Sequence, residues 1–455
     1  MIRITNTLSG KKEEFIPLEE GRVKMYVCGP TVYNLIHVGN ARAAVVFDSF
    51  RRYLEYRGYS VTYVQNFTDI DDKIIKTANE EGISTKRLSD RYVAEYFKDA
   101  CRLGIEPATF HPRTTDFVNE IIDFISVLQK KGFAYSKNGD VYFDVSAFKS
   151  YGALSNRKLS DMRSGARVEI NDSKDDPLDF VLWKAAKAGE PSWNSPWKSG
   201  RPGWHIECSV MSTTLLGDSF DIHAGGNDLI FPHHENERAQ SEAWSGKKWV
   251  NYWMHNGMIS VKKEKMSKSL GNIFNVREAL RVYGPNALRM YLLSKHYRSP
   301  MEFSSDRMEE AKASYNRIAN AMDEIKRKIG DDTKAVEDSF SKEWRARMNE
   351  ALDDDFNTPQ AFSVIFELVK EALLTDDREH LAKIRALFME WNYFLGFDFE
   401  KKNVNADAFV ETLVELRNTA RVRNDYEQAD AIRKKLKELG VEIRDSSNGS
   451  HWRWM

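Results

Sequence analysis

The sequence predicts an α/β protein with a Rossmann-like parallel sheet that carries an insertion, followed by a mostly α-helical bundle and a small C-terminal domain. Three observations predict this fold class. Residues 24–29 and 61–69 are short apolar strands joined by a helical pattern over 40–58. A strand–helix pattern returns near 204–261, after a stretch rich in Trp, Pro and Gly. From residue 305 onward the chain is almost entirely amphipathic helix with charged faces.

The composition is that of a globular protein. The 455 residues are 42% hydrophobic and 30% charged, which is sufficient to build a core. The net charge of -1 gives no sign of a nucleic-acid partner for the chain as a whole, although a local basic face would suffice. No apolar run approaches the ~20 residues of a membrane span, and the N-terminal segment lacks the apolar core of a signal peptide. We therefore expect a cytoplasmic protein that has no membrane partner.

The three cysteines, Cys28, Cys101 and Cys208, are too few and odd in number for a disulfide framework, and they favour a reducing compartment. Cys28 ends the first predicted strand. Cys101 lies in the helical region 71–104, where we expect it to be a plain core residue.

The first strand, helix and second strand form a βαβ unit, in which the strands are parallel and the crossover is right-handed. Ligands bind such sheets at the carboxyl ends of the strands. The segment HVGN (37–40) lies there, at the predicted helix start. Gly39 permits close backbone approach, the helix N-terminus offers free N–H groups, and His37 can donate to a phosphate. The alternative is a purely structural histidine.

A second motif, KMSKS (265–269), follows a predicted strand and places Lys262, Lys263, Lys265 and Lys268 on one loop. Such a charge run is either a solvated surface loop or a mobile cationic clamp on a triphosphate.

A candidate metal site combines residues from distant segments. His233 and Glu237 are four residues apart, and Pro232 suits the first position of a helix, so both side chains would share one face. With Cys28 and Cys208 they could form a tetrahedral Zn²⁺ site. The alternative is that both cysteines are small buried hydrophobes.

HVGN followed by KMSKS, each after a strand, resembles the two nucleotide-binding motifs of class I aminoacyl-tRNA synthetases. Within that class, the sequence resembles the cysteinyl-tRNA synthetase family. The segments that carry the resemblance are CGPTVYNLIHVGNAR, NFTDIDDKI, SPWKSGRPGWHIECS, DLIFPHHENERAQSEA and KMSKSLGN, and a similar C-terminal tail extends it to the final residues.

The resemblance implies an enzyme that activates L-cysteine with ATP to cysteinyl-adenylate and transfers it to the 3′ adenosine of tRNA(Cys). It implies one Zn²⁺ per chain, held by Cys28, Cys208, His233 and Glu237, that recognises the substrate thiolate, and Mg²⁺ that accompanies ATP. Catalytic roles fall on His37, Asn40, Lys265 and Lys268.

The resemblance also implies two substrate-binding groups. The ATP-binding residues would be Pro30, His37, Gly39, Asn40, Gly226, Asp228 and Lys268. The amino-acid pocket would be formed by Gly29, Thr68, Trp204 and His223. One departure concerns the loop at 223–226, which usually reads HGGG in this family. Ala224 replaces its first glycine here, and alanine resists a positive φ.

By the same resemblance, residues 1–110 and 201–250 are two halves of the catalytic domain, and 111–200 is a connective insertion. Residues 251–309 form a KMSKS-bearing stem-contact region, 310–400 an anticodon-binding bundle and 401–455 a small tRNA-binding domain. In the mildly basic tail, Trp452, Arg453 and Trp454 either help to read anticodon bases or pack the tail. We expect a monomer.

Two rival functions are weighed against this one. Ligases that join cysteine to an aminosugar-inositol share the adenylating half but lack a full anticodon-binding tail. A catalytically dead RNA-binding paralogue should have lost HVGN, KMSKS or the metal set, and all three are intact.

Overall fold

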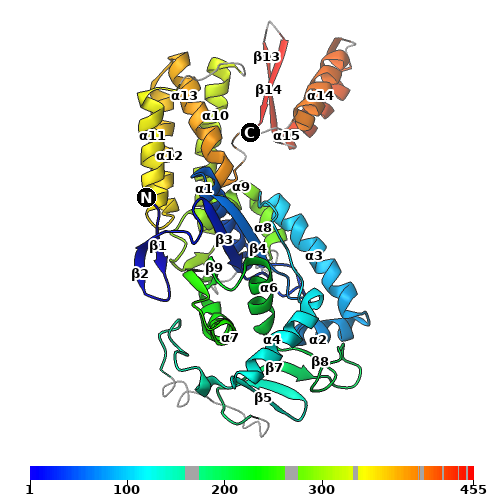
Figure 1. Cartoon of the computed structure of the whole chain (residues 1–455). Helices are drawn as coiled ribbons and strands as arrows, with labels where there is room; N and C mark the ends of the chain where they lie inside the picture. The colour runs from blue at the N-terminus through cyan, green and yellow to red at the C-terminus, as the bar shows by residue number, and fades with distance from the viewer. Residues whose placement is uncertain are drawn as a thin grey trace. The chain divides into compact units, whose positions relative to one another are not determined.

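The computed structural model describes residues 1–158, 174–261, 275–330, 337–397, 399, 404–422, 425–438, 440–446 and 449–454. The chain divides into two units, Met1–Phe399 and Glu400–Met455. Figure 1 shows their elements. Among the described residues, no helix combines the length and the apolar character that crossing a membrane requires.

The centre of the first unit is a four-stranded parallel sheet with strand order β10-β9-β3-β4, which confirms the predicted fold class. Its strands are β3 (Arg22–Val27), β4 (Ser60–Gln65), β9 (Phe220–Gly226) and β10 (Val250–Asn256). The crossover from β3 to β4 is α1 (Val38–Tyr56). Both predicted strands extended too far at their C-terminal ends. Beyond the last strand residues, the Thr68 N–H still donates to the Pro30 carbonyl at 3.3 Å, so the two loops stay together.

The helical region predicted over 71–104 is two helices, α2 (Asp72–Glu81) and α3 (Thr85–Arg102). The break falls at Gly82, whose φ of 64° is left-handed and ends α2. The prediction that Cys101 is a core residue was wrong, because its side chain is exposed. The buried stripe of α3 includes Tyr96 and Ala100, and one further residue turns Cys101 about 100° away from that stripe.

A second structured region lies between α3 and β9 along the chain. It contains α4 (Val118–Lys130) and an antiparallel sheet with strand order β5-β6-β7-β8. The strands are β5 (Ala134–Lys137), β6 (Asp140–Phe143), β7 (Phe180–Ala185) and β8 (Gly200–Pro202). Trp183 and Phe143 of this region belong to an apolar cluster that also includes Val210 and Ala239, which follow later in the chain. The chain then returns to the central sheet through α6 (Ile206–Leu216), β9 and α7 (Glu235–Ser245).

The N-terminal hairpin was not predictable from apolar patterning. It is formed by β1 (Arg3–Asn6) and β2 (Lys11–Glu14), and the Thr7 N–H between them donates to the Trp253 carbonyl of β10 at 2.9 Å. A short parallel pair, β11 (Ile259–Val261) and β12 (Met301–Phe303), follows the central sheet.

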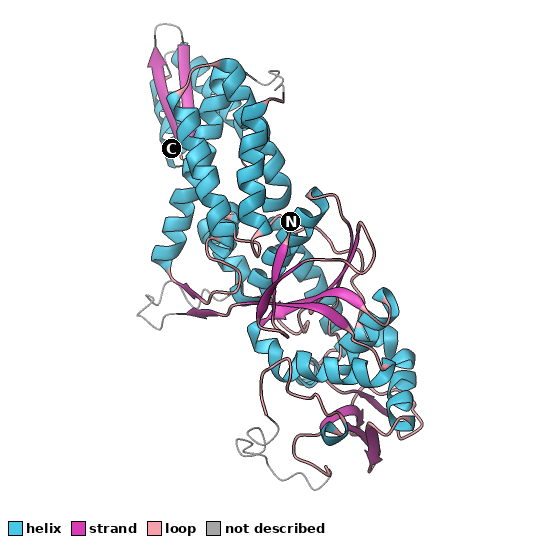
Figure 2. Cartoon of the chain, turned by 60° about the vertical axis from the view of Figure 1, so that its left-hand side comes forward, coloured by secondary structure: helices cyan, strands magenta, loops and turns pink. Residues whose placement is uncertain are grey.

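The rest of the first unit is helical (Figure 2), as predicted from residue 305 onward, and two further helices precede that point. Ser304, Asp338, Asn357 and Asp377 cap the starts of the last four helices by accepting backbone N–H groups. The helices are α8 (Val276–Tyr283), α9 (Pro285–Leu293), α10 (Ser305–Ile329), α11 (Ser339–Asp353), α12 (Thr358–Leu374) and α13 (Arg378–Leu395).

The second unit consists of α14 (Val404–Val422), α15 (Tyr426–Glu438) and an antiparallel pair, β13 (Val441–Ser446) and β14 (Gly449–Trp454). Val410, Val414, Leu436, Val441 and Ile443 form its core. Trp452 is partly buried against this core, which favours the packing role for that residue. Arg453 is exposed and pairs with Glu442 at 2.6 Å. The structure does not describe the side chain of Trp454.

Candidate active site and metal centre

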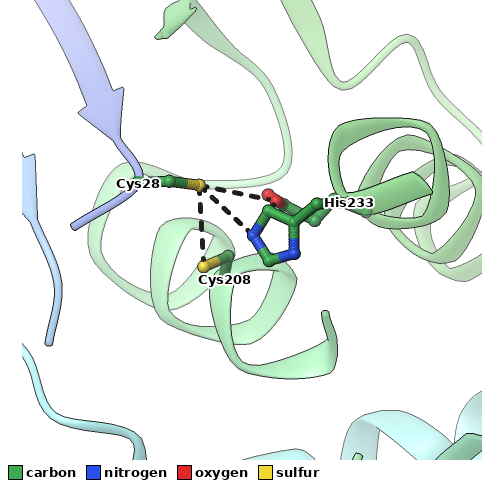
Figure 3. A group of neighbouring side chains, drawn as sticks. Cys28, Cys208 and His233 are labelled. Carbon is green, nitrogen blue, oxygen red and sulfur yellow. Dashed lines mark hydrogen bonds and ion pairs between the residues drawn. The ribbon is translucent and has the colours of Figure 1, made fainter. Parts of the chain in front are cut away.

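Four potential metal ligands meet at the carboxyl end of the central sheet. Cys28 follows the last residue of β3, Cys208 lies in the first turn of α6, and Glu237 lies in the first turn of α7. Together with His233 they place their ligand atoms within 4.8 Å of one another. Figure 3 shows the side chains of Cys28, Cys208 and His233 turned toward one another. The structure therefore brings together the four residues that the sequence singled out.

The distances in this group agree with those around a tetrahedral ion. Bonds of about 2.3 Å to sulfur and 2.0–2.1 Å to nitrogen or oxygen separate two sulfurs by about 3.8 Å, and sulfur from nitrogen or oxygen by about 3.6 Å. Cys28 Sγ lies 3.8 Å from Cys208 Sγ, 3.5 Å from His233 Nε2 and 3.5 Å from Glu237 Oε1. His233 Nε2 and Glu237 Oε1 are closer than the tetrahedral edge, at 2.8 Å, as hydrogen-bonded partners would be.

The prediction that Pro232 takes the first position of the helix was wrong. Residues Ile230–His234 form a separate wider turn, and α7 begins at Glu235. Because this turn runs directly into α7, His233 and Glu237 still lie on one side, four residues apart.

Further histidines surround the ligand cluster, and only His223 among them was predicted from the sequence. His223 is fully buried, its Nε2 lies 2.7 Å from Glu237 Oε2, and its ring stacks on Trp253. His205 Nδ1 lies 2.7 Å from His233 Nδ1. The adjacent residues His233 and His234 are the one sequence signal that could have pointed to these additional histidines.

His234 links Cys28 to the N-terminal hairpin. His234 Nε2 lies 3.3 Å from Cys28 Sγ, and its Nδ1 lies 2.8 Å from His255 Nε2. His255 Nδ1 in turn lies 2.7 Å from Thr7 Oγ1. A second potential ligand set, Cys28, His223, His234 and Glu237, shares two members with the first. The first set offers a metal two cysteine sulfurs and the second only one, which favours the first set for zinc.

The charges in the cluster depend strongly on its burial. Burial alone would raise the pKa of Glu237, but His233 and His223 together hold it well below its usual range. Burial raises the pKa of the Cys28 thiol, and neighbouring Cys208 and Glu237 raise it further. A metal that binds here must therefore displace the thiol proton.

Beside the cluster lie the residues predicted to line an amino-acid pocket. Gly29 passes so close to the Asn66 carbonyl that a Cβ would clash with it, so no larger residue fits. Thr68 is buried, and its Oγ1 donates to Glu207 Oε1 at 3.3 Å. Trp204 remains 48% exposed and stacks on the His233 ring at 5.2 Å. Glu207 was missed by the sequence analysis because a single glutamate next to a cysteine carries no signal.

The HVGN segment forms a helix cap. His37 is the N-cap of α1, and its Nδ1 accepts the N–H groups of Gly39 at 3.1 Å and Asn40 at 3.3 Å. The Asn40 side chain completes the box by accepting the His37 N–H at 3.2 Å. The expectation of free N–H groups was therefore wrong for these two. Because Nδ1 is an acceptor, the proton of the neutral ring lies on Nε2. Partial desolvation lowers the pKa of His37, and Asp228 partly offsets this.

The loop after β9 accommodates its alanine. Ala224 lies within β9, in register with Val27 and Met254, and its φ is not positive. The following glycines are the constrained ones. A Cβ on Gly225 would approach His234, and one on Gly226 would clash with Asp228 Oδ1. The predicted ATP-binding residues Gly226 and Asp228 thus form one tight turn at the sheet edge.

The lysines of the KMSKS motif, including Lys265 and Lys268, lie outside the described residues.

Comparison with solved structures identifies the class of this fold. Mycobacterium tuberculosis methionyl-tRNA synthetase in complex with methionyl-adenylate is 14% identical, with a TM-score of 0.59, and the match covers 82% of this chain and 89% of that one. A putative arginyl-tRNA synthetase from Campylobacter jejuni is 14% identical, with a TM-score of 0.55 and coverages of 86% and 95%. The fold is that of the class I aminoacyl-tRNA synthetases.

Sequence comparison narrows the class to one family. Residues 14–313 match the model of the tRNA synthetases class I (C) catalytic domain, 347–400 the DALR domain, and 406–453 the cysteinyl-tRNA ligase anticodon binding domain. A cysteine–tRNA ligase from Thermotoga maritima is 54% identical over 99% of both chains. One from Clostridioides difficile is 50% identical over 99% of this chain and 100% of its own length. The chain belongs to the cysteinyl-tRNA synthetase family and is thus a ligase.

Proposed function

We propose that this enzyme activates L-cysteine with ATP, forming cysteinyl-adenylate and pyrophosphate, and transfers the cysteinyl group to the 3′ adenosine of tRNA(Cys). The observation that carries the proposal is the cluster of Cys28, Cys208, His233 and Glu237 at the carboxyl end of the sheet. Because the His37 cap of α1 starts close along the chain from Cys28, an amino-acid subsite and a phosphate subsite can lie side by side.

The proposal includes one Zn²⁺ per chain, held by these four side chains. Two sulfurs, one imidazole nitrogen and one carboxylate oxygen are a donor set that suits zinc and not magnesium or calcium. When bound, Zn²⁺ would prefer the soft thiolate of cysteine to the hydroxyl of serine. Shape alone separates such close analogues by only about 1–3 kcal/mol. Mg²⁺ would accompany ATP.

No side chain is needed as a nucleophile, since the carboxylate of cysteine attacks the α-phosphorus itself. The residues of the chain position the reactants and stabilise charge. His37 would donate its Nε2–H to a phosphate oxygen, Asn40 would keep His37 in place, and Pro30, Gly39, Gly226 and Asp228 would border the nucleotide. Lys265 and Lys268 would offset the charge on the departing pyrophosphate.

The remaining assignments belong to the same proposal. Gly29, Thr68, Trp204 and His223 would shape the amino-acid pocket. His223 would act from behind Glu237, since it is fully buried. The domain boundaries given above, with tRNA contacts by the helical region and the tail, are proposed on the same basis, as are a monomeric state and a cytoplasmic location. Cys28 and Cys208 must stay reduced to bind a metal, which favours that compartment.

Two assays test this function against its rival. Metal-loaded protein should support cysteine-dependent exchange of pyrophosphate into ATP, and the absence of exchange would refute adenylation. Charging with radiolabelled cysteine then separates the acceptors. We expect charging of tRNA(Cys) and no product with an aminosugar-inositol, because the chain matches an anticodon binding domain at 406–453. Product with the aminosugar alone would support the rival ligase.

A further inference from the structure

Glu207 is a buried carboxyl group with one unoccupied oxygen. Glu207 is only 2% exposed. Its Oε1 accepts a hydrogen bond from the Thr68 hydroxyl at 3.3 Å, and its Oε2 has no hydrogen-bond partner. A buried polar atom without a partner costs free energy, and a buried charge costs much more. The arrangement is therefore incomplete as it stands.

The nearby cationic side chains do not complete it. Lys184 and Arg201 line the same small cavity as Glu207, but both pair with Asp72. Within the described ranges, no Lys, Arg or His nitrogen lies within 4.0 Å of a Glu207 oxygen. A cationic or hydrogen-bond-donating group from outside the chain can fill this position.

Glu207 lies where the amino-acid pocket and the metal ligands meet. It directly precedes Cys208, and its cavity of about 80 Å³ is also lined by Gly203 and Trp204. Its partner Thr68 is tied through its backbone to Pro30, two residues after Cys28. Short chain segments thus connect Glu207 to both candidate sulfur ligands.

We propose that Glu207, oriented by Thr68, receives the α-ammonium group of the amino-acid substrate. This inference rests on the proposed function and deepens it. In cysteine, only Cα and Cβ separate the amino nitrogen from the sulfur, so a thiolate at the metal cluster leaves the ammonium group nearby. The open Oε2 then gains a charge-assisted hydrogen bond, which is among the stronger kinds.

Such an arrangement lets the site recognise two groups of its substrate, the thiol and the α-amino group. The metal cluster selects sulfur, and Glu207 selects an α-amino group, so simple mercaptans are discriminated against. With both ends held, the substrate carboxylate is directed away from the cluster, toward the nucleotide.

Two cysteine analogues test the role by equilibrium binding to zinc-loaded protein. 3-Mercaptopropionate lacks the amino group, and cysteamine lacks the carboxylate. We expect Glu207→Gln to weaken the binding of cysteine and of cysteamine by at least about tenfold, while 3-mercaptopropionate changes less than about twofold. Equal loss for all three ligands, or no loss for any, would overturn the proposal.

Two controls keep the outcomes separate. Zinc content and thermal unfolding of Glu207→Gln should match those of the parent, so that a damaged metal site is detected. Glu242→Gln makes the same change in a carboxyl group that pairs with Arg238 at 3.0 Å, and it should leave all three affinities unchanged. If the parent protein binds no cysteine, the proposed function fails, whereas unaltered discrimination in Glu207→Gln refutes only this inference.

Discussion

His223 Nε2 lies 2.7 Å from Oε2 of Glu237, the oxygen that the candidate metal cluster leaves free. The other oxygen, Oε1, faces Cys28 and His233. Both carboxylate oxygens are therefore assigned, and the carboxylate cannot rotate without breaking the bond to His223. Stacking on Trp253 at 4.7 Å fixes the imidazole ring in turn.

This relationship predicts that His223 determines metal affinity without being a ligand. Groups that orient metal ligands typically change affinity by about 10–100-fold when removed. We expect His223→Gln to weaken Zn²⁺ binding by about that factor, measured by competition with a chelator. His380→Gln, in a histidine of α13 that pairs with Glu371, should have no effect. Parent-like affinity in His223→Gln would show that the orienting bond is unimportant.

The cysteines provide a matched pair of substitutions. Cys208 is buried in the cluster, whereas Cys101 is exposed. We expect Cys208→Ser to lose the one Zn²⁺ per chain and its cysteine binding, and Cys101→Ser to keep both. Metal analysis by mass spectrometry and calorimetric titration with cysteine provide the measurements. A metal-free protein that retains full cysteine-dependent exchange would contradict the role of zinc in recognition.

Part of this site could be predicted from the sequence. Apolar patterning placed Cys28 at a strand end, and a four-residue spacing placed His233 beside Glu237. Cys208 is 180 residues from Cys28 along the chain, so residue type alone made it a candidate ligand and the family resemblance was needed to favour the metal site over two buried hydrophobes. The link from Thr7 through His255 to His234 was not predictable, because it depends on a hairpin that lies next to β10 only in the folded chain.

Two local expectations were wrong for similar reasons. Helical periodicity identified the α3 segment but not the rotation that turns Cys101 outward, which depends on the neighbours that cover Tyr96 and Ala100. The helix start at His37 was recognised, but the rotamer that directs Nδ1 onto the backbone was not. Patterns in sequence thus predicted elements, whereas side-chain direction required the packed structure.

The capping role of His37 can be separated from its catalytic role. Asparagine is a good N-cap residue, but it lacks the Nε2–H that we expect to contact a phosphate. His37→Asn should therefore keep the unfolding temperature of the parent protein but lose most of the pyrophosphate exchange activity. His37→Ala should lose the exchange and also about 1 kcal/mol of unfolding free energy. Full exchange activity in His37→Asn would limit this histidine to a structural role.

The same cap predicts a dependence on pH. Nδ1 accepts two N–H groups and so must be unprotonated, and desolvation, the larger influence, lowers the pKa of His37 below its ordinary value of 6.5. Because the unfolded chain binds this proton more readily, the contribution of His37 to stability is present above pH 6.5 and is lost as pH falls through the lowered pKa. We expect the pyrophosphate exchange rate to fall over the same range, since protonation breaks the cap that orients Nε2. An NMR titration of the His37 ring gives the pKa directly, and His37→Asn should show no such step in unfolding free energy. A measured pKa above 6.5 would mean that the protonated ring is the favoured one and would contradict the capping geometry.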